Sequence, residues 1–164
     1  MTTDPGQDAH PSGLDALDRR IVGLFTADPH VGVLGAAREL GVARGTVTAR
    51  VRRLEERGVI TAWSPTLDPA AMGHPVTAFV TLQIRQVSGH DAVTAHLADI
   101  PEVLEVHTIT GDSDLLVRVV AASNAHLQRV LDVVTGHTDV LRSSSVIALA
   151  TQIPHRTLPL VAQA

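Results

Sequence analysis

Residues 33–58, VLGAARELGVARGTVTARVRRLEERG, constrain the fold more than any other part of this chain. They predict a helix, a turn broken by glycine and a second helix rich in arginine. Ala37 is small enough to let the helices approach, Gly41 permits a positive φ in the turn, and Val47 packs back. This spacing is typical of a helix-turn-helix. Ordinary antiparallel helices joined by a glycine turn give a similar pattern.

The second helix, predicted over 44–57, carries five arginines against Glu55 and Glu56. A single helix fits the major groove of DNA, and arginine can donate two hydrogen bonds to guanine. The alternative is a solvated arginine face. Arg50 is equally well explained by an ion pair with a helix acid. Packing in the turn is the lesser alternative for Thr46, and contact with backbone or solvent explains Arg57 better than contact with a base. The predicted DNA-contacting residues are Arg44, Thr46, Thr48, Arg50, Arg52 and Arg53.

Charge is distributed unevenly along the chain, whose formal net charge is −4. Residues 14–60 hold eight arginines and six acids, whereas residues 61–164 hold five arginines and nine acids. Because salt screens charges beyond roughly 8–10 Å, a locally basic helix is sufficient to attract phosphate. The net negative charge is therefore compatible with double-stranded DNA as a partner.

Several classes of function find no support in the sequence. The chain has no cysteine, no apolar run of membrane-spanning length and no signal-peptide pattern, which predicts a cytoplasmic protein without membrane contact. The nine histidines are scattered and lack metal-ligand spacing, so neither a metal site nor a cofactor is expected. No catalytic motif occurs. An enzyme is therefore not predicted, although ferredoxin-like dimers can enclose active sites.

The pattern predicts an α+β fold in four segments. Residues 1–13 are expected to be a disordered tail, 14–60 the helix-turn-helix domain, and 61–75 a linking strand with a connector. Asp15 is the predicted N-cap of the first helix, Asp28 and Pro29 end that helix, and Gly58 ends the third. Residues 76–164 are predicted to form a ferredoxin-like domain through which copies of the chain oligomerise.

Within that domain the expected element order is βαββαβ. Residues 76–86 alternate strictly between apolar and polar faces, and Ser123 is placed to cap the second helix. The remaining predictions are a helix over 90–99 and strands over 103–110, 114–121 and 139–150. Both helices cover one sheet face, so the other face retains apolar residues. Dimerisation through sheet faces is therefore expected.

Four strings occur in one order along the chain: LDALDRRIV from residue 14, TVTARVRRLEERGVI over 46–60, LDPAAMGHP from 67 and ITGDSDLLVRV from 109. Together they resemble the Lrp/AsnC, or feast/famine, family of transcription factors. The resemblance implies an N-terminal DNA-binding domain and a C-terminal domain that senses amino acids or related metabolites. It also implies homodimers that commonly assemble into tetramers or octamers. Two departures are Ala43, where the family often has Ser or Thr, and His155, where it often has Lys.

The turn over 111–114 is the predicted effector site. An amino acid needs an anion for its ammonium group and N–H donors for its carboxylate, and a glycine turn with two aspartates can supply both. A tight hairpin alone also explains the sequence. The predicted effector-binding residues are Thr108, Thr110, Gly111, Asp112, Ser113 and Asp114.

These features predict a sequence-specific DNA-binding regulator whose assembly responds to an amino acid or related metabolite. An architectural DNA-binding protein that responds to no effector is the alternative. A thermal-shift screen with amino acids distinguishes the two, because only the first binds one of them.

Overall fold

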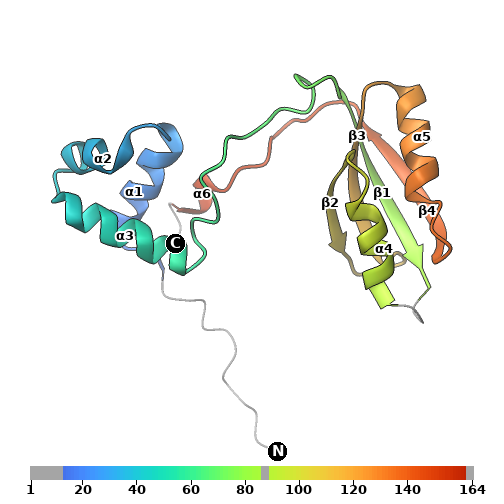
Figure 1. Cartoon of the computed structure of the whole chain (residues 1–164), viewed down its shortest axis with the longest axis horizontal. Coiled ribbons are helices and arrows are strands. Elements are labelled where there is room, and N and C mark those ends of the chain that lie inside the picture. Colours follow the sequence, from blue (N-terminus) through green and yellow to red (C-terminus); the bar gives the residue numbers. More distant parts are fainter. Residues whose placement is uncertain (1–12, 86–88, 162–164) are drawn as a thin grey trace, which may run out of the picture. The chain divides into compact units, whose positions relative to one another are not determined.

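A computed structural model describes residues 13–85 and 89–161 of the chain. The chain divides into two compact units (Figure 1). One unit contains the chain up to Pro65 together with its end from Pro154, and the other contains Thr66–Ile153. Within the described residues, no helix has the length and apolar character needed to cross a membrane.

The helical unit begins with three helices: α1 (Ala16–Ala27), α2 (Gly32–Leu40) and α3 (Arg44–Glu56). The predicted cap of α1 is confirmed. An Asp15 carboxylate oxygen accepts hydrogen bonds from the backbone N–H groups of Leu17 at 2.9 Å and Asp18 at 2.8 Å. The Asp18 side chain in turn accepts the N–H of Asp15, completing a capping box.

Glycines end α2 and α3 as predicted. Gly41 and Gly58 both have a φ of 69°, a left-handed conformation that costs other residues free energy. The turn at Gly41 brings α2 and α3 together around buried Ala37, Val47 and Leu54. The predicted helix-turn-helix is therefore present.

Trp63 packs within the helical unit. Its ring meets Phe25 edge-to-face with centroids 5.1 Å apart, and its indole N–H donates to a Glu55 carboxylate oxygen at 2.6 Å. The chain also returns to this unit as the short helix α6 (Leu158–Val161), whose Val161 packs against the core. The predicted second domain extended to residue 164, whereas residues 154–161 group with the helical unit.

The sheet unit has four antiparallel strands in the order β2-β3-β1-β4. Its elements are β1 (Val76–Ile84), α4 (Gly89–Ala98), β2 (Val103–Thr108), β3 (Leu115–Ala121), α5 (Asn124–Val134) and β4 (Val140–Ala148). The Ser123 hydroxyl accepts the N–H of His126 and caps α5. The predicted ferredoxin-like βαββαβ arrangement is confirmed.

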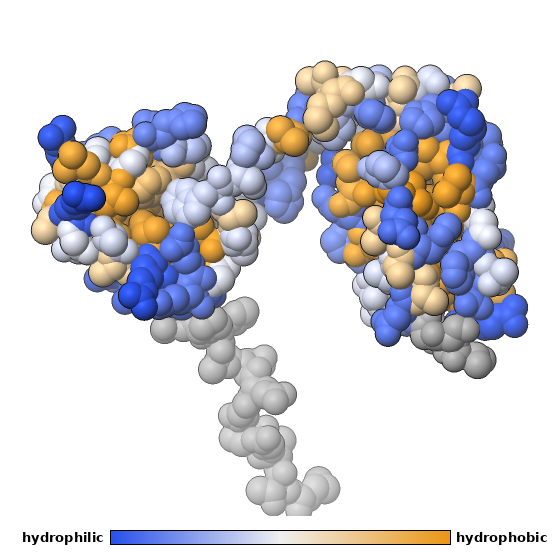
Figure 2. Space-filling model, in the orientation of Figure 1, coloured by the Kyte–Doolittle hydropathy of each residue, from blue (hydrophilic) through white to orange (hydrophobic). Residues whose placement is uncertain are grey.

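Both helices pack on one face of this sheet. Val80 and Leu82 of β1, Val93 and Leu97 of α4 and Val130 of α5 lie in one buried cluster. Figure 2 shows hydrophobic residues of each unit gathered together and bordered by hydrophilic ones. Because side chains alternate along a strand, the residues between the buried ones project to the other face.

That other face, which we call the open face, carries exposed apolar side chains. Phe79 of β1 and Val146 of β4 are register partners and are 36% and 64% exposed. Further residues of the open face, in register across β1, β3 and β4, are Thr77, Thr81, Gln83, Leu116, Arg118, Val120, Arg142, Ser144 and Ala148. The expected apolar open face is present.

The predicted linking strand is wrong for the single chain. Residues 61–67 form no strand, since a strand needs a hydrogen-bonding neighbour and no described strand pairs with them. The connector instead ends in a tight turn. The N–H of His74 donates to the Pro69 carbonyl at 2.8 Å, and Gly73 has a φ of 89°. The predicted tail over 1–13 lies almost entirely outside the described residues.

Candidate functional site

An exposed stripe of side chains runs along α3. Arg44, Thr48 and Arg52 are spaced four residues apart, so they lie above one another on one helix face, with Gly45 and Ala49 beside them. Arg52 has 78% of its side chain exposed, and it pairs with Glu56 at 2.7 Å. The face combines two cations with small residues that keep the backbone accessible. A polyanion can therefore approach it closely.

The N-terminus of α3 lacks a side-chain cap. Ala43 occupies the N-cap position and provides no acceptor, as the sequence predicted. The Thr46 N–H bonds to the Ala43 carbonyl at 3.0 Å, and the exposed Thr46 side chain lies in the same turn. Backbone N–H groups at an uncapped helix start favour anions such as phosphate.

Arg50 and Arg53 project toward α1 instead. Arg53 donates to Asp18 at 2.6 Å, and Arg50 donates to Asp18 at 3.1 Å and also to Asp15. The hydrogen bond from Arg50, reinforced by the backbone N–H of Asp18, lowers the pKa of Asp15 from 3.8 to about 2. Asp18 itself is fully buried. These ion pairs join α3 to α1, and they agree with the ion-pair explanation for Arg50.

The predicted effector turn connects β2 to β3. Gly111 has a φ of 111°, which allows the chain to reverse. Asp114 then fastens the turn to β1. Its N–H donates to the Leu82 carbonyl at 2.9 Å, and its carboxylate accepts the Ile84 N–H at 2.8 Å. Asp114 therefore has a structural function in the hairpin, whereas Asp112 is exposed.

A hollow of about 570 Å³ opens beside this turn. It is lined by Thr81, Gln83, Gly111, Asp112, Ser113, Asp114, Arg142, Ser143 and Ser144. Thr108 and Thr110, which were also predicted, are not among the lining residues. The Arg142 guanidinium can receive a carboxylate and Asp112 can receive an ammonium group. The hollow thus offers both charges that a free amino acid requires.

Sequence reasoning did not find Arg142 or Gln83. They are register partners on β4 and β1, and β4 lies almost sixty residues beyond β1 along the chain. Alternation on the predicted strands places each residue on a sheet face, but it does not show that β1 and β4 are neighbours. The strand order supplies that missing step.

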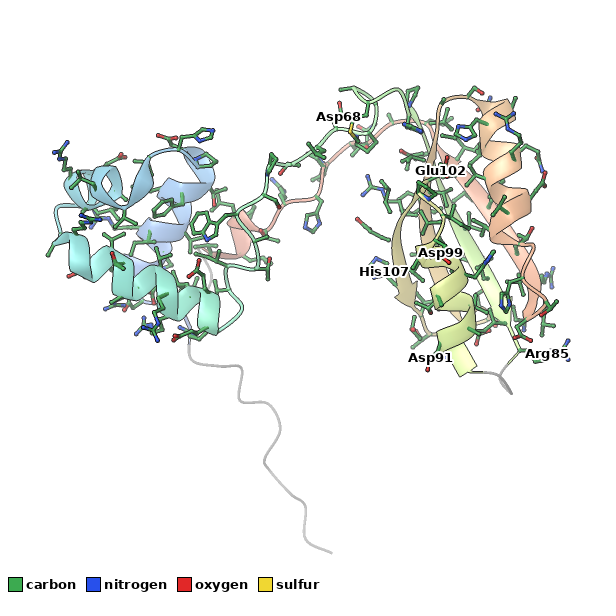
Figure 3. All side chains as sticks on the ribbon, viewed as in Figure 1. Asp68, Arg85, Asp91, Asp99, Glu102 and His107 are labelled. Atoms are coloured by element: carbon green, nitrogen blue, oxygen red, sulfur yellow. The ribbon has the colours of Figure 1, made fainter. Side chains whose placement is uncertain are left out.

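A second polar cluster was also missed. His74, Glu102 and His126 each present a ligand atom, and these atoms lie within 4.8 Å of one another. The three residues come from the connector, the α4–β2 turn and the first turn of α5. Figure 3 labels Glu102 at that turn. Because the residues are far apart in sequence, no spacing rule could have gathered them.

Comparisons with known proteins match both units. The Lrp/AsnC ligand binding domain matches residues 77–158, and a winged helix-turn-helix DNA-binding domain matches residues 14–61. The HTH-type transcriptional regulator LrpA of Mycobacterium tuberculosis is 32% identical over 134 residues, which span 82% of this chain and 89% of LrpA. The HTH-type transcriptional regulator FL11 of Pyrococcus horikoshii is 29% identical, covering 90% of this chain and 97% of FL11.

Solved structures agree with these matches. The feast or famine regulatory protein of M. tuberculosis complexed with L-methionine is 32% identical with a TM-score of 0.77, covering 88% of this chain and 98% of that chain. Escherichia coli AsnC, 23% identical with a TM-score of 0.82, covers 90% of this chain and 100% of its own and shares the fold.

Proposed function

This chain belongs to the Lrp/AsnC family of transcriptional regulators, which are not enzymes, and from that premise we propose that α3 reads duplex DNA through Arg44, Thr48 and Arg52. The observation that carries the proposal is the division of the arginines of α3. Arg50 and Arg53 are bound to α1, whereas Arg44 and Arg52 lie on the outer face. A rigidly held helix with an outward cationic stripe suits the major groove.

The stripe and the N-terminal turn of α3 suit different parts of the duplex. Thr46, Thr48 and the uncapped backbone N–H groups at the helix start fit phosphate oxygens, which position a protein on DNA. Arg52 has the reach for a guanine edge. It must first leave Glu56, and an exposed ion pair between residues i and i+4 contributes little because water and salt screen it. This small cost does not hinder DNA contact.

The test is DNA binding by fluorescence anisotropy, with the region upstream of the protein's own gene as probe and random-sequence DNA as competitor. Arg52→Ala and Arg44→Ala should each weaken binding by about tenfold or more, as expected for loss of a base or phosphate contact. Glu39→Gln is the matched control, since Glu39 is an exposed charged residue on α2. Unchanged affinity in both arginine variants would exclude this face.

For the sheet unit, the proposed ligand is an amino acid or a related small metabolite in the hollow at 111–114. The support is its pair of opposite charges, Arg142 and Asp112, together with the L-methionine complex of the relative that is 32% identical. Thr81, Gln83, Arg142 and Ser144 belong both to this hollow and to the open face. A ligand there can change how copies of the chain associate through that face.

The proposed assembly is a homodimer formed through open faces, with tetramers or octamers built from it. Exposed Phe79 and Val146 supply the apolar centre that such an interface needs. Paired α3 helices would then contact half-sites about one DNA turn apart or a multiple of it. Since its proposed partner is the chromosome, the proposed location is the cytoplasm.

A thermal-shift screen with the amino acids tests the ligand proposal separately. A rise in melting temperature with one or a few of them is expected, and Arg142→Gln should abolish it. If no amino acid shifts the melting temperature while DNA binding persists, the protein is an architectural DNA-binding protein without an effector.

A further inference from the structure

We infer that His74, Glu102 and His126 form a binding site for a divalent transition-metal ion of the zinc class. Two imidazoles and one carboxylate are a ligand set used for Zn²⁺ with at least one position left for water. The site lies in the sheet unit and shares no residue with the hollow at 111–114. It depends on neither the DNA proposal nor the amino acid proposal.

The distances suit a metal of this size. With bonds of about 2.0–2.1 Å at tetrahedral angles, two ligand atoms lie about 3.3 Å apart. Nε2 of His126 and a carboxylate oxygen of Glu102 are separated by 3.3 Å. All three ligand atoms lie within 4.8 Å of one another. To reach the spacing of about 3.3 Å from the other two, the ligand atom of His74 must move by at most about 1.5 Å. A side-chain rotation covers that distance.

Elements packed around the site hold its ligands in place. Glu102 is fixed by its own carbonyl, which accepts the N–H of Val120 at 2.9 Å. The Met72 carbonyl lies 3.3 Å from Nδ1 of His74. When that nitrogen donates its proton to the carbonyl, Nε2 of His74 retains a free lone pair, which is the usual arrangement of a metal-binding histidine.

His126 requires one rearrangement. Its Nδ1 accepts the N–H of Ala122 at 3.1 Å, which places the ring proton on Nε2, facing Glu102. Metal binding through Nε2 moves this proton to Nδ1 and breaks the Ala122 hydrogen bond. The cost is that of one ordinary hydrogen bond, roughly five- to tenfold in affinity. Three ligand bonds outweigh it.

The ligand chemistry selects the metal class. Imidazole nitrogen suits zinc, cobalt and nickel, whereas magnesium and calcium require oxygen ligands. All three side chains are partly buried. This limits competition from bulk water while leaving a path for the ion. His74 stands at the end of the connector, two residues before β1, so a bound ion ties the connector to the body of the sheet unit.

The experiment titrates Co²⁺ into the full chain without a histidine tag and follows the visible absorption bands of four-coordinate cobalt. One Co²⁺ per chain is expected, displaced by Zn²⁺ and removed by a chelator. His74→Ala, His126→Gln and Glu102→Gln should each lower the affinity at least tenfold. Circular dichroism of the metal-free variants verifies that they fold.

His107→Ala is the matched control. His107 lies 3.5 Å from the Glu105 carboxylate and is 61% exposed, but within the part of the chain that the structure describes no third ligand joins this pair. The His107→Ala variant should bind Co²⁺ with the same affinity as the unaltered chain. The assignment is overturned if folded variants at all three positions retain full Co²⁺ affinity, or if His107→Ala loses as much as they do. The affinity for DNA, measured in the presence of a chelator, should be the same whichever of these results is obtained.

Discussion

Asp18 of α1 has no solvent-exposed surface, and its carboxylate accepts a 2.6 Å hydrogen bond from Arg53 of α3, 35 residues further along the chain. The other carboxylate oxygen accepts a hydrogen bond from Arg50 at 3.1 Å. Two arginines of α3 therefore meet one buried acid. The orientation of α3 depends on this contact as much as on apolar packing.

Asp18→Asn should destabilise the helical unit. The substitution preserves shape but removes the charge that both guanidinium groups face, and breaking a buried ion pair costs several kcal/mol. Because Arg53 is 46% exposed, we expect a loss of roughly 2–3 kcal/mol. Denaturant unfolding followed by Trp63 fluorescence measures it, since the only tryptophan packs on Phe25 in this unit. Glu39→Gln should leave the midpoint unchanged, and an equally stable Asp18→Asn variant would contradict the prediction.

Acid should weaken the same unit through Asp15. Its pKa is lowered from 3.8 in the unfolded chain to about 2 in the folded protein, chiefly by the Arg50 hydrogen bond. A lowered carboxylate pKa contributes stability that is complete above the unfolded value and disappears as the pH falls through the folded value. Stability should therefore fall between about pH 4 and pH 2. Asp15→Asn retains a good N-cap and should lack this component. Stability is measured against pH for both proteins by means of Trp63 fluorescence. If the two stability profiles have the same shape between about pH 4 and pH 2, Asp15 has no such role.

The two aspartates of the 111–114 turn should behave differently. Asp114→Ala deprives the Ile84 N–H of its acceptor and should cost the sheet unit about 1–2 kcal/mol. Asp112→Asn should leave stability unchanged and reduce the response to an amino acid ligand. Differential scanning calorimetry with and without the ligand found in the screen separates these effects. Equal loss of stability in both variants would disagree with the hydrogen bonding of the turn.

Val146→Glu should disrupt assembly of the chain. Val146 lies opposite Phe79 on the open face, so a second copy covering that face would bury the new charge. Sedimentation should show smaller particles than those of the unaltered chain. Val133→Glu, which introduces the same charge at a 49% exposed valine on α5, is the control. If Val146→Glu assembles normally, the interface lies elsewhere.

Sequence reasoning was most accurate where structure is determined locally. The Asp15 and Ser123 caps, the glycine ends of α2 and α3 and the alternation of β1 depend on neighbours within a few residues. It failed where distant segments meet. The partners of Arg53, the pairing of Gln83 with Arg142 and the cluster around His126 all depend on tertiary arrangement.

The end of the chain also could not be predicted. The segment RTLPLV has few residues and a proline, which gives no strong helical period, and α6 packs against α1. The strand predicted after residue 60 failed for a related reason. Alternation can indicate that a segment is able to pair, but a strand forms only where a neighbour exists.

Because α6 returns to α1, the helical unit is interrupted by the whole sheet unit, which forms an insertion within it. During synthesis, Val161 is added after the whole of the sheet unit. The continuous stretch 66–153 can fold while translation proceeds, whereas the helical unit acquires the packing contact of Val161 only after the sheet unit has been synthesised. A stop codon shortly after residue 153 would therefore damage the DNA-binding helical unit, although the missing codons follow those of the whole sheet unit.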